Sequence, residues 1–118
     1  MLKLGHYDGA YYLAGYAVEF ALKACIAKGT RRYEFPDKGK AVSSYTHVLR
    51  DLVGVAKLGD ALQERERSDP DFRANWVVVR SWSEGSRYER HTMESAKELI
   101  EAVGETRHGV ISWIKLHW

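Results

Sequence analysis

Residues 7–28, YDGAYYLAGYAVEFALKACIAK, are the most apolar stretch of the chain and contain no proline. Apolar residues occupy nearly every face at helical spacing, which predicts a helix that is buried on all sides. One stripe is made almost wholly of small residues: Ala10, Ala14, Ala17, Ala21 and Ala24. Small residues let another helix approach closely. We therefore expect a central helix that begins near Asp8 and stops at Gly29.

The next part of the chain predicts a loop and two short helices. Residues 30–44 hold one proline and one glycine without a sustained period, which is typical of a loop. Thr46 is a candidate N-cap for a helix whose apolar positions recur as far as Leu58. After a break at Gly59–Asp60, residues 61–67 predict a second, mostly polar helical segment.

A further helix is predicted from Phe72. The sequence Ser68-Asp69-Pro70-Asp71 is typical of a helix start, because proline is favoured in the first turn. Apolar residues then recur at helical spacing as far as Trp82. The β-branched run Val77–Val79 alone would favour a strand, but the chain offers no second strand candidate. We expect a helix that ends near Glu84–Gly85.

Thr92 is a candidate N-cap for one last helix, whose apolar face continues to the C-terminus at Trp118. Gly104 and Gly109 weaken its middle by about 1 kcal/mol each relative to Ala, so a bend or a close contact is expected there. Arg107 falls on the apolar stripe, which is unusual. The pattern as a whole predicts an all-α protein.

Composition bounds the class of protein. A chain of 118 residues forms one domain, here 1–118. A net charge of +2 is too small to indicate a nucleic-acid binder by itself. The single Cys25 suits a reducing compartment, and residues 1–5 lack the long apolar run of a signal peptide. We expect a cytoplasmic protein with no membrane span.

The stretch YDGAYYLAGYAVEFALKACIAK resembles the signature helix of the HEPN domain family, which is rich in Tyr and Ala and ends in a Glu, three residues and a Lys. Glu19 and Lys23 occupy these two positions. Later features follow in the family's order: Thr46-His47, Trp76, Trp82 and Arg87-Tyr88. The resemblance covers roughly residues 5–118 and implies an up-and-down bundle of four to five helices. The family's first helix would be short or missing, since only residues 1–6 precede the signature helix.

The resemblance also implies partners. Such domains are often homodimers, and a helix that is apolar all round needs partners on every side, which a second copy supplies where its own chain does not. We therefore predict a homodimer. Relatives of this kind are often encoded beside a minimal nucleotidyltransferase, as a toxin–antitoxin or nucleotide-handling pair. This implies a binding or regulatory module associated with a nucleotide or RNA.

An alternative function is a metal-independent ribonuclease. The catalytic branch of the family carries an Arg, four to six residues, and then a His that acts as acid or base. Arg87 and His91 are separated by only three residues, and Arg107 and His108 are adjacent. No Arg and His pair fits that spacing, so the sequence favours a protein without this activity. The rival hypothesis is a rearranged site in which Arg107, His108 and His91 are the weak catalytic candidates, with Arg87 beside them.

Glu19 and Lys23 stand four residues apart, in the favourable order for a helical ion pair. On an apolar helix, Glu19 should need further partners, and Arg87, Arg107 or His47 could supply them. Such a cluster would either fix the register of the helices or form a pocket for a nucleotide or an RNA phosphate. The candidate ligand-binding residues are Glu19, Lys23, His47, Trp82, Arg87 and Tyr88.

The five histidines show no metal-binding spacing with another His, Asp or Glu, so we predict no metal site and no cofactor. A third hypothesis is a structural module that only dimerises and docks another chain through exposed Trp113 and Trp118.

Overall fold

The computed structural model describes residues 7–32, 48–83, 85 and 91–118. Within these ranges every regular element is helical: α1 (Tyr7–Arg32), α3 (Leu49–Val55), α4 (Gly59–Ser68), α5 (Pro70–Arg80), α6 (Met93–Gly104) and α7 (Val110–Lys115). The predicted all-α class is confirmed. None of the described helices is both long enough and apolar enough to cross a membrane.

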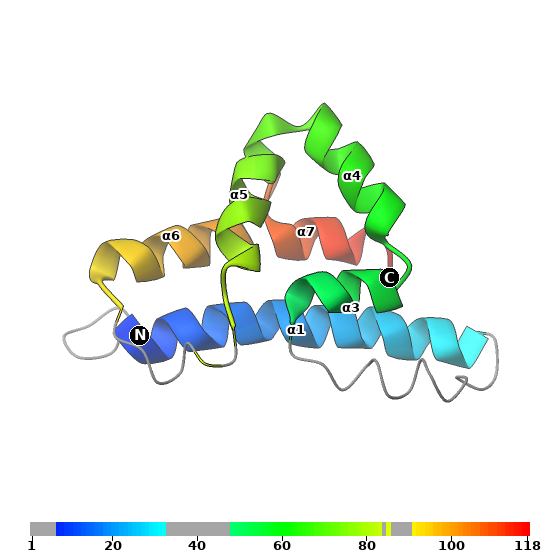
Figure 1. The fold of residues 1–118 in the computed structure, drawn as a ribbon, viewed down its shortest axis with the longest axis horizontal. Helices are drawn as coiled ribbons and strands as arrows, with labels where there is room; N and C mark the ends of the chain where they lie inside the picture. Colours follow the sequence, from blue (N-terminus) through cyan, green and yellow to red (C-terminus); the bar gives the residue numbers. More distant parts are fainter. Residues whose placement is uncertain (1–6, 33–47, 84, 86–90) are drawn as a thin grey trace.

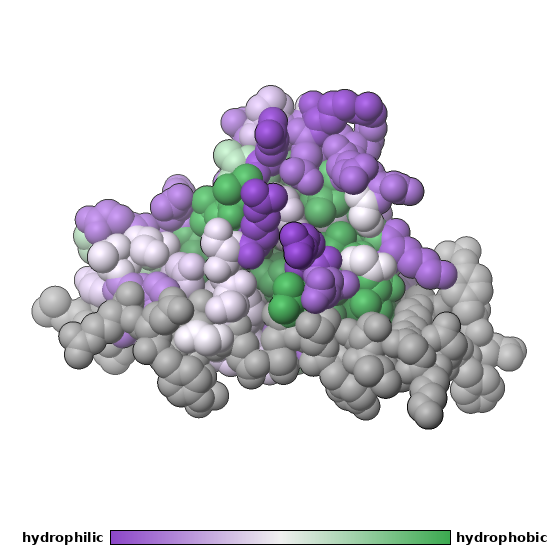
Figure 2. Space-filling view, in the orientation of Figure 1, coloured by the Kyte–Doolittle hydropathy of each residue, from purple (hydrophilic) through white to green (hydrophobic). Residues whose placement is uncertain are grey.

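Helix α1 is the base on which the other helices are arranged (Figure 1). α6 packs along its N-terminal half, while α3 and α7 lie over its C-terminal half. α4 and α5 form a hairpin that rises from this layer, and α5 contacts both α6 and α7. Hydrophilic residues cover α4 and the upper part of α5, as Figure 2 shows.

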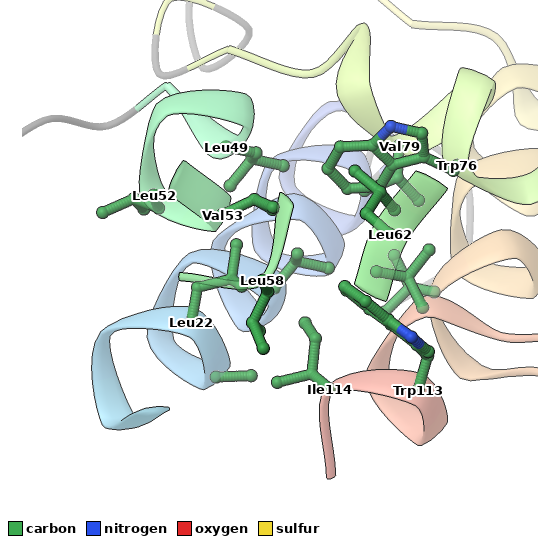
Figure 3. Packing of buried hydrophobic residues seen from close by; sticks show 14 of the residues in the cluster. Leu22, Leu49, Leu52, Val53, Leu58, Leu62, Trp76, Val79, Trp113 and Ile114 are labelled. Atoms are coloured by element: carbon green, nitrogen blue, oxygen red, sulfur yellow. The ribbon is translucent and has the colours of Figure 1, made fainter. Parts of the chain in front are cut away.

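The core lies where α1, α3, α5 and α7 converge (Figure 3). Side chains from all four helices are fully buried or nearly so: Leu22, Leu49, Leu52, Trp76, Val79, Trp113 and Ile114. Burying one such side chain contributes roughly 1.5–3 kcal/mol. The prediction that Trp113 is exposed was wrong, because its side chain is only 2% exposed. Trp118, in contrast, is half exposed.

Helix α1 is not buried on all sides, which corrects the expectation from its composition. Val18, Leu22 and Ile26 are buried against the other helices, but Leu13 is 47% and Phe20 60% exposed. The physical reason is the arrangement of the other helices, because α3, α6 and α7 all pack against α1 from the same side (Figure 1). The described helices therefore cover one side of α1.

The exposed side of α1 carries a continuous apolar row that we call the outer stripe: Leu13, Ala17, Phe20, Ala24 and Ala27. All five are exposed. The alanine stripe seen in the sequence is accordingly divided, since Ala10 and Ala21 are buried and Ala17 and Ala24 face outward.

Two helix ends differ from the predictions. α1 continues through Gly29 to Arg32, because a glycine stops a helix only when the chain turns there into the left-handed conformation. α5 ends at Arg80, and the amide of Trp82 already bonds back to Val79 in a turn. The predicted cap Thr46 lies outside the described residues.

The predicted single last helix is two helices. α6 ends at Gly104 and α7 begins at Val110, with a tight turn between them. The Glu105 carboxylate accepts hydrogen bonds from the amides of Arg107 and His108, and a Cβ at Gly109 would overlap the Glu105 backbone. Arg107 lies exposed in this turn. The unusual arginine on the predicted apolar stripe is thereby explained, because the stripe assumed one continuous helix through this position.

Candidate functional site

The predicted ion pair on α1 is present. The Nζ atom of Lys23 lies 3.4 Å from Oε2 of Glu19, and Glu19 is a buried charged residue, only 3% exposed. Arg107, one of its three expected partners, lies exposed in the α6–α7 turn. His47, Arg87 and Tyr88 lie outside the described residues, so their predicted roles stay predictions.

Trp82 is a core residue in this structure. Its side chain is 2% exposed, and its ring covers Gly15 so closely that a Cβ there would overlap it. The ring of Tyr12 lies 5.8 Å from it, centroid to centroid. A stacking face for a base has to be accessible, and the buried indole presents none in this conformation.

A polar cluster that we call the His108 corner forms where the α4–α5 junction meets the α6–α7 turn. It consists of Arg65, Asp69, Asp71, Glu105 and His108. Asp69 is the N-cap of α5, and its Oδ1 accepts a hydrogen bond from the amide of Phe72. Its Oδ2 lies 2.7 Å from Nδ1 of His108 and 3.4 Å from Nε of Arg65.

The His108 ring spans two carboxylates. While Nδ1 faces Asp69, Nε2 lies 3.8 Å from Oδ2 of Asp71. The hydrogen bond from His108 holds the pKa of Asp69 below its ordinary value, and the same bond raises the pKa of His108. Backbone amides of His108 and Arg107 lower the pKa of Glu105.

A pocket of about 330 Å³ opens beside this cluster. Three carboxylates and one imidazole line it, together with Ala74 and Asn75. The carboxylates are those of Asp71, Glu101 and Glu105, and the imidazole is that of His108. Asn75 donates a hydrogen bond to the carbonyl oxygen of His108 at 2.9 Å, which holds the turn against α5. The arrangement can accept a proton or bind a cation at Nε2 of His108.

Sequence reasoning named His108 but missed Asp69 and Asp71. It looked for metal or acid–base partners at helical spacing, whereas the aspartates lie nearly forty residues before the histidine. The signal that could have drawn attention to them is the helix-start sequence Ser68-Asp69-Pro70-Asp71, in which two carboxylates flank a proline.

A protein-family profile described as "HEPN domain" matches residues 1–116. The chain belongs to the HEPN domain family. No curated protein and no solved structure matches significantly. Membership of this family suggests an RNA-related or nuclease-like function.

In this HEPN domain the candidates for a rearranged Arg/His site are spread apart. His91 lies just before α6. Its ring stacks on the ring of Tyr11, with 3.7 Å between the centroids, and its backbone amide donates a hydrogen bond to the Asp8 carboxylate. His108 follows the other end of α6, and the twelve residues of that helix span about 18 Å. One chain therefore does not bring His91 and His108 into the same site.

Proposed function

We propose that this HEPN domain is a homodimeric binding or regulatory module associated with a nucleotide or RNA, and that a second copy packs on the outer stripe of α1. The observation that supports the proposal is the stripe itself. Soluble monomers rarely expose large contiguous apolar patches, and such patches mark interaction sites.

The spacing of the stripe suits a helix partner. Its residues follow one another at intervals of four, three, four and three, which is the pattern by which two helices pack side by side. Large Leu13 and Phe20 alternate with small Ala17 and Ala24. In an antiparallel pair centred on Ala17, the small Ala17 side chains of the two copies face each other, and Leu13 of one copy packs against Phe20 of the other. A two-fold axis near Ala17 makes the contact self-complementary.

Single cysteines test this geometry. Cys25 is first replaced by Ser; it is half-buried, its Sγ lies 3.9 Å from the carbonyl oxygen of Ile114, and burial raises its pKa. In that background Ala17→Cys should form a disulfide-linked dimer under mild oxidation, because the two-fold axis brings equivalent residues together. Gln63→Cys, on the exposed side of α4, is the matched control and should stay monomeric. Equal cross-linking of both would contradict the proposed interface.

A protein partner fits a second surface. Leu116 and Trp118 are exposed near the C-terminus, and we propose that they dock a minimal nucleotidyltransferase in a toxin–antitoxin-like pair. Co-expression with the product of the adjacent reading frame tests this. Co-purification that is lost in Leu116→Ser, Trp118→Ser supports the docking site, and co-purification that persists in this variant contradicts it.

The proposal also requires that the domain itself does not cleave RNA. Total RNA is incubated without metal, with wild-type protein and with an Arg107→Ala, His108→Ala double variant. We expect intact RNA in both. Cleavage by the wild type that the double variant loses would establish the ribonuclease alternative, with His108 oriented by Asp69 as its base.

A further inference from the structure

We infer that the His108 corner binds one divalent transition-metal ion of the zinc class, with Nε2 of His108 and the carboxylate of Asp71 as its protein ligands. Asp69, in this arrangement, is the carboxylate that orients the ring. The inference is independent of the proposed dimer, because no residue of α1 takes part.

The first observation in favour of a metal ligand is the orientation of the His108 ring. Oδ2 of Asp69 lies 2.7 Å from Nδ1 of His108. The neutral ring therefore carries its proton on Nδ1, and this N–H donates a hydrogen bond to the carboxylate. The lone pair then resides on Nε2. A carboxylate behind the distal nitrogen is the usual support of a metal-bound histidine, since it fixes the tautomer and makes the ring a better ligand.

The position of Asp71 carries the second step. Its Oδ2 lies 3.8 Å from Nε2 of His108, which is too long for a hydrogen bond. Two ligands held at about 2.0–2.2 Å from one tetrahedral ion lie about 3.4 Å apart. The Asp71 side chain is 79% exposed and can make this small adjustment by rotation. The candidate ligand atoms of Asp69, Asp71 and His108 all lie within 4.8 Å of one another.

The pocket supplies room and negative charge. Glu101 and Glu105 line it together with Asp71, so an entering cation meets three carboxylates. Glu105 is already held by two backbone amides, which leaves water or Glu101 to complete the coordination. Arg65, the positive group of the same cluster, pairs with Asp69, its Nε lying 3.4 Å from Oδ2 of that carboxylate.

The ligand chemistry selects the metal. Imidazole with carboxylate suits Zn²⁺ and its neighbours Co²⁺ and Ni²⁺, whereas Mg²⁺ and Ca²⁺ prefer an all-oxygen shell. Two protein ligands make an open site, with water in the remaining positions. Because the ligands come from α5 and the α6–α7 turn, the ion binds the folded chain better than the unfolded one and stabilises it.

The experiment titrates tag-free protein with Zn²⁺ by calorimetry at about pH 8, a pH chosen above the ordinary histidine range because the hydrogen bond to Asp69 raises the pKa of His108, and with Co²⁺ by visible absorption. We expect one site per chain, Co²⁺ bands of a nitrogen-ligated ion, and no comparable binding of Mg²⁺. Asp71→Asn should weaken Zn²⁺ binding by about tenfold or more without changing the melting temperature in chelator. Asp60→Asn, which removes an exposed first-turn carboxylate of α4, is the matched control and should bind as the wild type.

Nitrogen NMR of the histidine rings identifies the ligand directly. Zn²⁺ should shift Nε2 of His108 and leave the exposed His117 unchanged. The inference is overturned if Zn²⁺ shifts His117 or another ring instead of His108, or if Asp71→Asn binds Zn²⁺ as tightly as the wild type.

Discussion

The two sides of α1 have the same kind of side chain and opposite surroundings. On the inner side Leu22 and Val18 are fully buried beneath α3, α6 and α7, and on the outer side Leu13 and Phe20 are about half exposed. Hydropathy alone cannot distinguish them. The difference teaches that the apolar content of a helix measures how much surface needs cover, but not whether the same chain provides it.

The largest effect should come from one substitution made on both sides. Leu22→Ala removes a fully buried side chain and should lower the free energy of unfolding by about 2–5 kcal/mol. Leu13→Ala, on the same helix, should change it by no more than about 0.5 kcal/mol. Urea unfolding of both variants, at concentrations low enough to keep the chain monomeric, measures the contrast. Equal losses would mean that the outer stripe is also core.

A glycine pair sharpens the same comparison. A Cβ at position 15, on the inner side of α1, would overlap the Trp82 ring, so Gly15→Ala should cost about 1–3 kcal/mol. Gly54 in α3 has open space around it, and Gly54→Ala should stabilise by about 0.5–1 kcal/mol. Thermal unfolding followed by circular dichroism checks both signs. A stabilised Gly15→Ala variant would show that the indole does not pack there.

The His108 corner should respond to pH, whereas the apolar core should not. The raised pKa of His108 means that its contribution to stability is complete below its ordinary value of 6.5 and declines as pH rises through the folded value. The lowered pKa of Asp69 means that its contribution is complete above 3.8 and is lost as pH falls through the folded value.

The difference in melting temperature between the wild type and His108→Gln should therefore be larger at about pH 5.5 than at about pH 8.5. Leu22→Ala serves as the control, with a difference that does not vary in this way. Melting curves in chelator exclude any contribution from metal. A larger difference at alkaline pH would contradict the hydrogen bond between His108 and Asp69.

The smallest change in stability is expected for the ion pair between Glu19 and Lys23 of α1. Lys23→Ala removes the 3.4 Å contact with Glu19 and should cost about 0.3–0.5 kcal/mol at low salt, with less at high salt. Lys28→Ala, an exposed lysine farther along α1, is the control. Paired urea titrations at two salt concentrations check this. A loss that salt leaves unchanged would mean that Lys23 acts through packing instead of charge.

Sequence patterns predicted the features that depend on neighbouring residues. The helix start within residues 68–71, the cap of α6 at Thr92 and the single helical face of Phe72, Trp76 and Val79 are confirmed. Each depends on residues within a few turns of one another. The family resemblance is confirmed by the family profile that matches residues 1–116, and its most specific motif also depends on neighbouring residues, since it lies within α1.

Features that depend on residues distant in the chain could not be predicted in this way. The turn between α6 and α7 is set by the Glu105 carboxylate and by the close approach at Gly109, which periodicity does not register. The same turn buries Trp113 and brings His108 to Asp69. The exposure of the outer stripe could not be predicted for a related reason, because it depends on where the other helices lie.

The central claim is that a second copy covers the outer stripe of α1. Size-exclusion chromatography with light scattering at micromolar concentration tests it most directly, using the wild type and Phe20→Glu, with Val77→Glu on the exposed side of α5 as control. We predict twice the chain mass of 13.5 kDa for the wild type and the control. Phe20→Glu should run as a folded monomer with an unchanged helical spectrum. A monomeric wild type, or a Phe20→Glu variant that remains a dimer, would contradict the account.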